Sequence, residues 1–485
     1  MIRFENPADA KLFGEILLDA GFRESELAKR LNLDRVGSPK PEDLPVFLLR
    51  LGAVPKLGVM VRLLTVNEPV TRAEAEDAFA PLPLETILAT GLLRVAGDGR
   101  IESVLKMMPF GDYIVVCDRE DREGEADYVM GNSSSSTLVY ASTVRRPVKR
   151  MLDLCAGSGF QALSSPDIAE TIVATDLNER AVMLGEFAAA INGADNITYR
   201  TGSLYEPVAG ETFDLITANL PLVISPEMRF VFRDGGPGIC ERGVRQTAQH
   251  LNEGGWASIG ICWTHRVGAD WLEEIAGWLE GSGCDGLLLK GETMDVPSYA
   301  SHWLWQTDSK DEASFRRRHV EWVAYFESEG ISHLGMGSML LHKVSSRPNW
   351  FDTDDYPAKW FANATDQIER MFAVRTLLHS PGVDEELLKL PLRISPTLRL
   401  VQTSRPGTSK WEMYEMMIHT EDAMRFEGRI DPAVLGILTR CTGATPLGSI
   451  IQAFAESVKA PIEKVMPAIL PLMKAQLERG YLLLP

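Results

Sequence analysis

The sequence predicts an α/β protein built around an open, doubly wound sheet, and short apolar runs carry that prediction. The runs span residues 151–154, 171–174 and 213–217, and polar turn residues bound each of them. Runs of this length and setting are typical of buried parallel strands. The segment 181–191 between the later runs has helical spacing, so strand, turn, helix and strand follow one another as in βαβ units.

The turn after the first run contains two glycines and begins with an acidic residue. It reads Asp153-Leu-Cys-Ala-Gly157-Ser-Gly159. Glycines let a backbone bend sharply and let a ligand approach closely. The turn is no phosphate loop, because no Gly-Lys-Ser/Thr follows, and it departs from GxGxxG because Cys155 stands at the first glycine position. Asp176 follows the second run, about two dozen residues after the start of the glycine turn. At this spacing along the sequence, such folds place an acidic residue that binds a pair of ribose hydroxyls.

The run at 213–217 leads into the tetrapeptide Asn219-Leu220-Pro221-Leu222. With the glycine loop and Asp176 in this order, residues 145–344 resemble the class I S-adenosylmethionine-dependent methyltransferases. The branch concerned includes release-factor glutamine methyltransferases and N6-adenine or N2-guanine methyltransferases, which have a D-x-G-x-G-x-G loop and an N-P-P-Y/F tetrapeptide. The resemblance implies a Rossmann-like core of seven strands and S-adenosyl-L-methionine as cofactor.

The resemblance also implies which residues bind the methyl donor. Asp176 would take the ribose hydroxyls, and Leu177 would pack on adenine. Ser203 stands where relatives often carry Asp, and it would accept a hydrogen bond from the adenine amine less strongly. The full expected set is Asp153, Cys155, Gly157, Ser158, Gly159, Asp176, Leu177, Ser203, Leu204 and Asn219.

The tetrapeptide implies the chemistry. By resemblance, the Asn219 side-chain carbonyl and the Leu220 backbone carbonyl accept the two hydrogens of a planar NH₂ group, and Pro221 fixes the turn. These three residues form the expected catalytic set. Relatives carry an aromatic fourth residue that stacks on a flat substrate, and Leu222 in its place weakens the case for a nucleobase. Substrate contacts are expected at Leu222, Tyr205, Arg233 and Asp234.

Three domains are expected: 1–105, 106–345 with its core from 148, and 346–485. The first resembles a winged helix, with helices near 59–64 and 84–90, a helix capped by Thr71 and Glu74, and a hairpin over 94–101. It is either a DNA-binding module or a substrate or dimerisation module. We favour the latter, because residues 83–93 contain no Lys or Arg. The end of the chain predicts helices at 446–455 and 465–480, again winged-helix-like, and an apolar tail that could add a strand.

Other segments give coarser expectations. Residues 106–130 predict two strands joined by the charged stretch 118–125. The serine-rich segment 131–137 is either a flexible surface loop or a lid over the donor. Strands at 256–263, 286–289 and 333–344 and helices at 271–279 and 312–329 should complete the core. Residues 346–410 read as irregular.

Composition limits the functional classes. No apolar run is long enough for a membrane span, and the first residues contain acids where a signal peptide would be apolar. The six cysteines are scattered without a C-x-x-C pair, which suggests neither zinc nor a disulfide framework and fits a reducing cytoplasm. Residues 151–350 carry −13 of the formal charge of −18, which argues against a nucleic-acid substrate.

These observations predict a cytoplasmic S-adenosylmethionine-dependent methyltransferase that methylates nitrogen in a small metabolite or a peptide-like substrate. Three alternatives stay open: an N-methyltransferase of a protein glutamine or an RNA base, an O-methyltransferase, and a donor-binding scaffold without turnover. We expect no metal and no membrane partner, and a homodimer could form through the end domains.

Overall fold

The computed structural model describes residues 2–33, 44–52, 54–227, 229–231, 233, 238–308, 311–357, 359–360 and 362–485. The chain divides into two compact units. The first comprises Met1–Tyr140, Pro147–Cys284 and Glu292–Ser345, and the second comprises Ala141–Arg146, Asp285–Gly291 and Ser346–Pro485. The three-domain division expected from the sequence stays a prediction.

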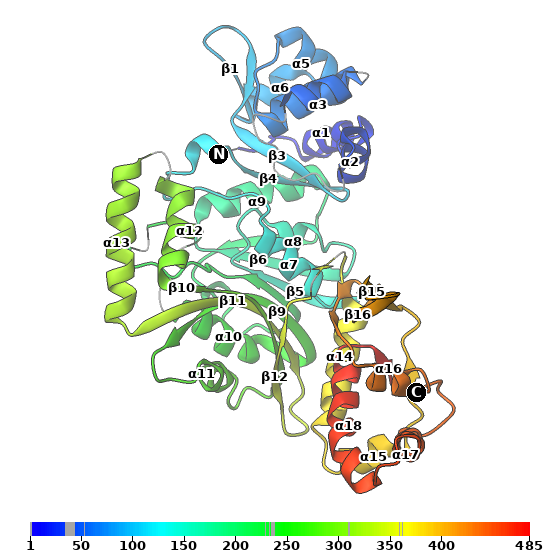
Figure 1. Cartoon of the computed structure of the whole chain (residues 1–485). Coiled ribbons are helices and arrows are strands. Elements are labelled where there is room, and N and C mark those ends of the chain that lie inside the picture. Colours follow the sequence, from blue (N-terminus) through cyan, green and yellow to red (C-terminus); the bar gives the residue numbers. More distant parts are fainter. Residues whose placement is uncertain are drawn as a thin grey trace. The chain divides into compact units, whose positions relative to one another are not determined.

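A sheet of eight strands forms the centre of the fold (Figure 1), in the order β12-β10-β11-β9-β8-β5-β6-β7. Strand β5 pairs in parallel with β6 and β8, β6 with β7, and β8 with β9, whereas β11 is antiparallel to β9. This confirms the α/β class. Seven strands were expected, and the eighth, β12, comes from beyond the predicted core and pairs in parallel with β10. The strands are β5 (Val148–Leu154), β6 (Ala169–Asp176), β7 (Ile197–Thr201), β8 (Phe213–Asn219), β9 (Leu251–Arg266), β10 (Cys284–Asp295), β11 (Ile331–Lys343) and β12 (Phe351–Asp355).

Helices cover both faces of this sheet, and Figure 1 shows α9 and α10 on opposite sides of it. Helix α9 (Glu179–Asn192) begins at the N-cap Asn178, whose side chain accepts from the Arg180 N–H, and ends at Gly193 with φ 63°. The order of the strands reverses at β5, so the carboxyl ends of β5, β6 and β8 meet where such sheets bind ligands. The other helices are α8 (Phe160–Leu163), α10 (Ile239–His250), α11 (Trp271–Trp278), α12 (Val296–Asp308) and α13 (Glu312–Ser328).

The N-terminal elements pack directly on this core. A Cβ at Gly14 would lie 1.8 Å from the carbonyl oxygen of Ile191, so only glycine lets α1 approach α9 this closely. The expected capping box of Thr71 and Glu74 is present, and the helices and the hairpin follow in the expected order. Whether they act as a winged helix stays a prediction. The elements are α1 (Pro7–Asp19), α2 (Glu24–Leu31), α3 (Leu44–Leu51), α4 (Pro55–Met60), a π-helical turn (Val61–Val66), α5 (Arg72–Phe79), α6 (Leu84–Ala89), β1 (Leu93–Val95) and β2 (Ile101–Ser103).

Two local predictions between 105 and 142 are wrong. Strands β3 (Leu105–Phe110) and β4 (Tyr113–Asp118) are joined by a turn at Gly111, whose φ is 57°, and the charged stretch follows β4 instead of joining the pair. A tight turn needs such a φ, which glycine supplies. The interpretation of the serine-rich segment 131–137 as a flexible loop is wrong from Ser134 on, because Ser134–Ser142 forms helix α7, whereas its interpretation as a lid stays a prediction. The Ser133 hydroxyl accepts from the Ser136 N–H at 3.1 Å and so caps the first turn of α7.

The second unit is more regular than the sequence suggested. Helix α14 (Thr365–Leu378) lies in the segment read as irregular, and it buries Ile368, Met371 and Phe372, which recur at helical spacing. The predicted C-terminal helices and strand are present, and β19 pairs with β14. The remaining elements are β13 (Lys359–Trp360), α15 (Val383–Lys389), β14 (Arg393–Ile394), β15 (Leu398–Pro406), β16 (Trp411–Thr420), β17 (Met424–Arg425), β18 (Glu427–Arg429), α16 (Pro432–Leu438), α17 (Leu447–Ser457), α18 (Ile462–Glu478) and β19 (Leu482–Leu483).

Candidate active site

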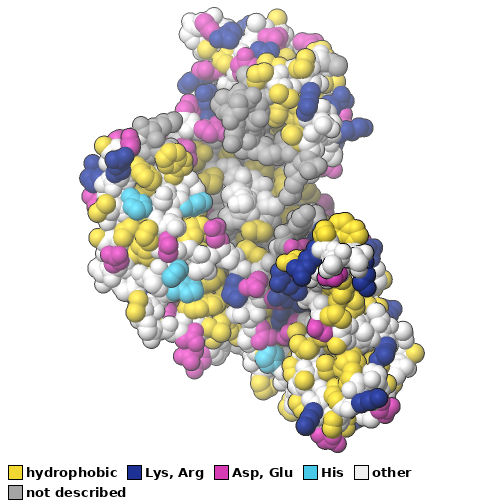
Figure 2. Space-filling view, viewed as in Figure 1, with side chains coloured by type: hydrophobic (Ala, Val, Ile, Leu, Met, Phe, Trp, Pro, Cys, Tyr) yellow, Lys and Arg dark blue, Asp and Glu magenta, His cyan; other side chains and the backbone are white. Residues whose placement is uncertain are grey.

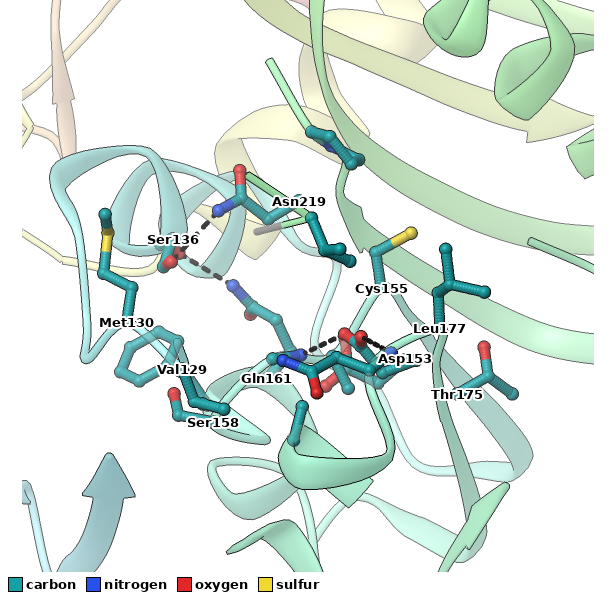
Figure 3. Close-up of a pocket in the computed structure, with 18 of the residues that line it drawn as sticks. Val129, Met130, Ser136, Asp153, Cys155, Ser158, Gln161, Thr175, Leu177 and Asn219 are labelled. Atoms are coloured by element: carbon teal, nitrogen blue, oxygen red, sulfur yellow. Dashed lines mark hydrogen bonds between the residues drawn. The ribbon is translucent and has the colours of Figure 1, made fainter. Parts of the chain in front are cut away.

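A pocket lies at the carboxyl ends of β5, β6 and β8 (Figure 3). It brings together most of the predicted site residues from segments that are far apart in the sequence. Ten of them line it: Asp153, Cys155, Gly157, Ser158, Asp176, Leu177, Ser203, Leu204, Asn219 and Pro221. Their individual roles stay predictions.

The loop after β5 forms a cradle at this pocket. Cys155 and Gly157 both have a positive φ, 55° and 54°, which turns the backbone sharply between the strand and α8. A Cβ at Gly157 would meet no protein atom within 4 Å. A side chain there would therefore occupy open space beside the pocket, which a ligand can use instead. This is the fit that an elongated nucleoside cofactor requires.

Asp176 ties this loop to the next strand. Its carboxylate accepts the Gly157 N–H at 2.8 Å through one oxygen and the Asn178 N–H at 2.8 Å through the other. A carboxylate has about four acceptor positions, so capacity for ligand hydroxyls is left. Burial raises the pKa of Asp176, and the hydrogen bonds to the backbone oppose that rise. Leu177 is 58% exposed and presents an apolar surface at the same edge.

Asp153 points into the protein rather than out of the loop. Its carboxylate accepts the Ala162 N–H at 2.9 Å and the Thr217 hydroxyl at 3.3 Å. Burial raises the pKa of Asp153 to about 7, despite these hydrogen bonds. The Asp153 side chain thus fixes the start of α8 and the shape of the loop.

Position 159 is occupied by glycine for a structural reason. It was expected to bind the donor, but it is not among the lining residues of the pocket. Its φ is 75°, and a Cβ there would lie 2.4 Å from the Tyr199 hydroxyl oxygen. The same Tyr199 ring leaves no room for a Cβ at Gly185 in α9, where the separation would be 2.2 Å. These two glycines accommodate the buried ring between α9 and the loop.

Asn219 ends β8 and points its amide toward the first turn of α7. Its Nδ2 lies 3.2 Å from the Ser135 hydroxyl and 3.1 Å from the Ser136 hydroxyl, and Figure 3 shows the contact with Ser136. The carbonyl oxygen is buried and has no hydrogen-bond partner among the described residues. Asn219 faces Gly260 of β9 in the sheet, and a Cβ at Gly260 would lie 3.0 Å from this oxygen. A buried acceptor without a partner is rare and asks for a functional explanation.

The other tetrapeptide residues divide between the pocket and the core. Pro221 lines the pocket. Leu220 is 2% exposed, and its side chain packs on α10 where Gly243 leaves room for it. Leu222 does not line the pocket, so its expected contact with substrate is not supported by its position.

Two further expected substrate contacts lie elsewhere. Tyr205 is buried, its hydroxyl is 2.6 Å from that of Thr247, and its ring stacks on His250. Arg233 is 5% exposed and donates to the Trp303 carbonyl oxygen at 3.2 Å, so it is directed toward α12. Neither side chain lines the pocket, and each has a hydrogen-bond partner elsewhere in the fold. Asp234 lies outside the described residues.

Sequence reasoning missed one wall of the pocket. Residues 128–131 and the first turn of α7 line it, and so do residues adjacent to the recognised motifs. Gln161 donates to the Ser136 carbonyl oxygen at 2.7 Å and joins this wall to the glycine loop. The sequence pointed to this wall only through the serine-rich segment 131–137, and there only in the interpretation of that segment as a lid over the donor. The missed residues are Tyr128, Val129, Met130, Gly131, Ser133, Ser136, Ala156, Phe160, Gln161, Thr175, Asn178, Ala181, Gly202, Val231 and Ile239.

The site and the sheet define a class of protein. A doubly wound sheet with a glycine cradle, an acidic residue at the end of the second core strand and Asn219 beside the pocket is the arrangement of a class I methyltransferase domain. Its cofactor is S-adenosyl-L-methionine. Among the described residues, no group of three or more His, Cys, Asp or Glu side chains is placed to hold a metal ion.

Comparison with known proteins identifies the same domain. Residues 131–270 match the family model of the methyltransferase small domain. Residues 11–103 and 369–485 match two families, each described as a domain of unknown function (DUF7059 and DUF7782). Residues 131–270 are therefore similar to a methyltransferase domain, and the matched segment on each side of them belongs to a family of unknown function.

Curated relatives match about a quarter of the chain. A release factor glutamine methyltransferase of Xylella fastidiosa is 28% identical over 144 residues, which is 27% of this chain and 52% of that relative. A ribosomal protein uL3 glutamine methyltransferase of Xanthomonas campestris pv. campestris is 30% identical over 125 residues, which is 23% of this chain and 41% of that relative. The chain thus spans about half the length of these relatives. A solved structure of ribosomal protein L11 methylase from Lactobacillus delbrueckii subsp. bulgaricus is 24% identical and covers 32% of this chain and 72% of that one, with a TM-score of 0.25.

Proposed function

We propose that the protein transfers the methyl group of S-adenosylmethionine to a nitrogen atom of a small or peptide-like acceptor. The observation that carries the proposal is the buried Asn219 carbonyl oxygen, which has no partner among the described residues and stands beside the donor pocket. An unpaired acceptor at the carboxyl end of a core strand suits a substrate N–H.

The chain's own contribution is positioning. A sulfonium methyl group is already activated, so transfer depends on holding the acceptor in line with it. Asn219 would accept one hydrogen of the acceptor nitrogen, and the Leu220 carbonyl the other, which shifts electron density toward the reacting nitrogen. The hydroxyls of Ser135 and Ser136 hold the Asn219 amide from the other side. Asp176 would hold the ribose hydroxyls, and the cradle at Gly157 would admit the rest of the donor.

Within this class, the side-chain amide of a protein glutamine is a specific candidate. The names of two matched relatives state that activity, and a carboxamide is the planar NH₂ group that the tetrapeptide suits. The matches cover about a quarter of this chain and about half of the relatives, so the substrate of this chain is a proposal. A free small metabolite with a similar amide or amine is the other candidate.

A nucleic-acid substrate is disfavoured. Residues 151–350 carry −13 of the chain's charge of −18. On the face drawn in Figure 2, the coloured Lys and Arg side chains around α12 and α13 are interspersed with Asp and Glu. Nucleic-acid enzymes need a basic groove beside the chemistry.

The proposal extends to location and partners as the sequence suggested. We propose a cytoplasmic protein with a peptide-like or small-molecule substrate, and end domains that bind substrate or a second copy of the chain. Among the described residues, every helix is too short or too polar to cross a bilayer.

Label transfer tests the function. Purified protein is incubated with S-adenosylmethionine labelled in the methyl group and with a cell extract separated into protein, RNA and small-molecule fractions. The proposal expects base-stable label in the protein or small-molecule fraction. Label that mild base releases would indicate an oxygen ester, and label removed by RNase would indicate an RNA base. Donor binding without any transfer would indicate a scaffold.

A further inference from the structure

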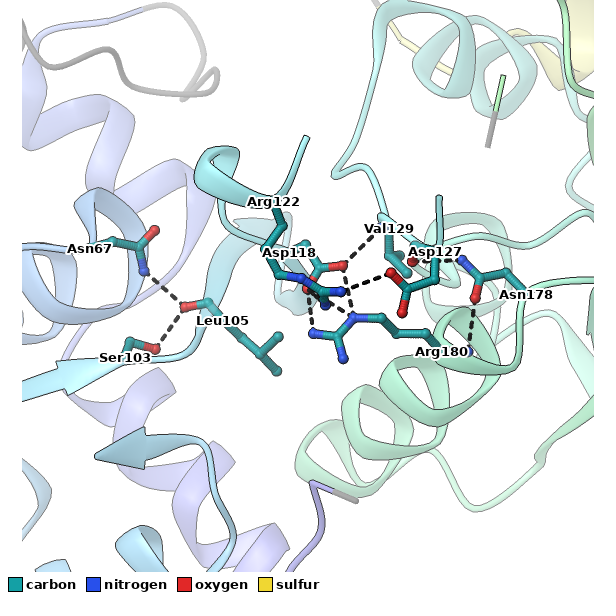
Figure 4. A network of polar contacts seen from close by, with 9 residues as sticks. All are labelled: Asn67, Ser103, Leu105, Asp118, Arg122, Asp127, Val129, Asn178 and Arg180. Atoms are coloured by element: carbon teal, nitrogen blue, oxygen red, sulfur yellow. Dashed lines mark hydrogen bonds and ion pairs between the residues drawn. The ribbon is translucent and has the colours of Figure 1, made fainter. Parts of the chain in front are cut away.

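A buried carboxylate sits next to the donor pocket without facing it. Asp118 ends β4, and its side chain is fully shielded from solvent. Figure 4 shows that Arg180 reaches it from α9. The Arg180 Nε lies 3.1 Å and 2.9 Å from the two carboxylate oxygens, and its Nη2 lies 2.5 Å from one of them. Arg122 adds a contact at 3.3 Å.

The same carboxylate pins one wall of the pocket. It accepts the Val129 N–H at 2.9 Å, and the Asp118 N–H donates to the Val129 carbonyl oxygen at 3.0 Å. Val129 therefore has both of its backbone groups bonded to a single residue. Because residues 128–131 all line the pocket, the position of this wall depends on Asp118.

Arg180 belongs to the opposite wall. It stands in the first turn of α9, between Asn178 and Ala181, which both line the pocket. A second link runs in parallel, because the Asn178 Nδ2 donates to the Asp127 carbonyl oxygen at 2.9 Å. Asp127 in turn accepts from Arg122 at 2.8 Å. Two bridges thus join the segment 127–131 to the start of α9, directly after Asp176.

We propose that Asp118 and Arg180 are positioning residues that set the width of the donor pocket at its nucleoside end. The inference rests on the proposed function in that it takes this pocket as the donor site. A buried carboxylate needs its charge partner, and its bidentate pairing with a guanidinium fixes distance and orientation together. Hydrogen bonding to Asp118 also raises the pKa of Arg180, so the guanidinium stays charged over the working range of pH. Neither side chain lines the pocket, so both act through Val129 and Asn178.

Donor binding measured by calorimetry tests this without knowledge of the acceptor. We expect Arg180→Met to raise the Kd for S-adenosylmethionine about tenfold, since the two walls lose their fixed separation. Arg180→Lys keeps the positive charge but loses the bidentate contact with the Asp118 carboxylate, so its Kd should fall between those of wild type and Arg180→Met. Turnover at saturating donor, once an acceptor is known, should change far less than the Kd.

The matched control is Arg94→Met. Arg94 pairs with Glu102 at 2.6 Å in the β1–β2 hairpin, and neither residue lines the pocket. Its variant should bind the donor like wild type. If Arg180→Met does not fold, Arg122→Met tests the same carboxylate through its weaker contact, with a smaller rise in Kd expected.

Melting temperatures separate positioning from general stability, and binding is measured well below each of them. A lower melting temperature with unchanged Kd in the folded variants would overturn the proposal, because Asp118 and Arg180 would then be a buried ion pair that stabilises the fold without positioning the pocket. If wild-type protein itself does not bind S-adenosylmethionine, the proposed function fails instead. A raised Kd in Arg180→Met that Arg180→Lys partly restores supports the proposal.

Discussion

The backbone N–H of Gly157 donates to the carboxylate of Asp176 at 2.8 Å, so the loop after β5 and the end of β6 are held together by the residue that would bind the donor ribose. The bond explains why an acid is suited to this position even before a ligand arrives. It orders the cradle and leaves acceptor capacity on the carboxylate. Loop order and donor affinity should therefore change together when Asp176 is replaced.

Asn219→Ala should lower turnover on the order of 10²-fold, because one preorganised polar group at the reacting centre is lost. Donor affinity should move only by about a factor of a few, since the nucleoside contacts lie on other loops. Steady-state kinetics with labelled donor, together with calorimetry, separates the two quantities. Full turnover in this variant would show that Asn219 only ends strand β8 and has no role in turnover, and it would favour oxygen methylation.

The variant Asn219→Asp tests whether the substrate that accepts the methyl group is a cationic amine or a neutral amide. The substitution keeps an acceptor oxygen and adds a negative charge. An acceptor amine that is cationic in solution should tolerate it, whereas a neutral amide should lose turnover as in Asn219→Ala. Ser136→Ala is the matched change on the other side of the amide. It should cost turnover only about a factor of a few, because Ser135 still contacts Nδ2.

Gly159→Ala should destabilise the fold by roughly 1–3 kcal/mol, because the new Cβ would meet the Tyr199 hydroxyl at a positive φ. Tyr199→Phe alone should be neutral or slightly stabilising, since this buried hydroxyl has no hydrogen-bond partner among the described residues. The double variant should recover about 0.5–1 kcal/mol of the loss. Urea unfolding of the four proteins measures this coupling, and strictly additive values would refute the contact.

Asp153 should make stability depend on pH. Burial raises its pKa to about 7, so between pH 4 and pH 7 the folded chain retains a proton that the unfolded chain has released. Its contribution to the free energy of unfolding therefore falls as pH rises through this window and levels off above it. Relative to wild type, Asp153→Asn should gain roughly 1–3 kcal/mol between pH 5 and pH 8. An equal difference at both pH values would show that the carboxyl is ionised throughout.

The end domains should not bind nucleic acid specifically. The candidate reading helix α6 contains Glu85 and no Lys or Arg, and the chain is acidic overall. Fluorescence anisotropy with mixed DNA and RNA near physiological salt should show at most contacts of about 10⁻⁴–10⁻⁶ M. A nanomolar complex that survives added salt would reverse this expectation.

What the sequence predicted well is local. The three core strands, the turn at Gly157, Asp176 and Asn219 follow from short apolar runs and from residues next to them in the chain. Helix α7 was not predicted for a reason that is also local: serines are weak helix formers, and the helix depends on the cap at Ser133.

Long-range contacts account for the rest. Asp118 and Arg180 are 62 positions apart, and nothing in either neighbourhood predicts their pairing. Gly159 was assigned to the ligand because of its motif, whereas the buried Tyr199 from β7 explains why it is glycine. Tyr205 and Arg233 were placed by their nearness to the motifs in sequence, but each found its partner within the fold.

Calorimetric titration of S-adenosylmethionine into wild-type protein and Asp176→Ala tests the central claim most directly. Charge-assisted hydrogen bonds are worth roughly 1.5–3 kcal/mol each, so the variant should bind the donor about tenfold more weakly or worse. Circular dichroism of both proteins verifies that the variant is folded. Saturable binding by wild type with this loss in the variant is the result predicted here. Equal affinity in a folded variant, or no binding by wild type, would contradict the assignment of the pocket.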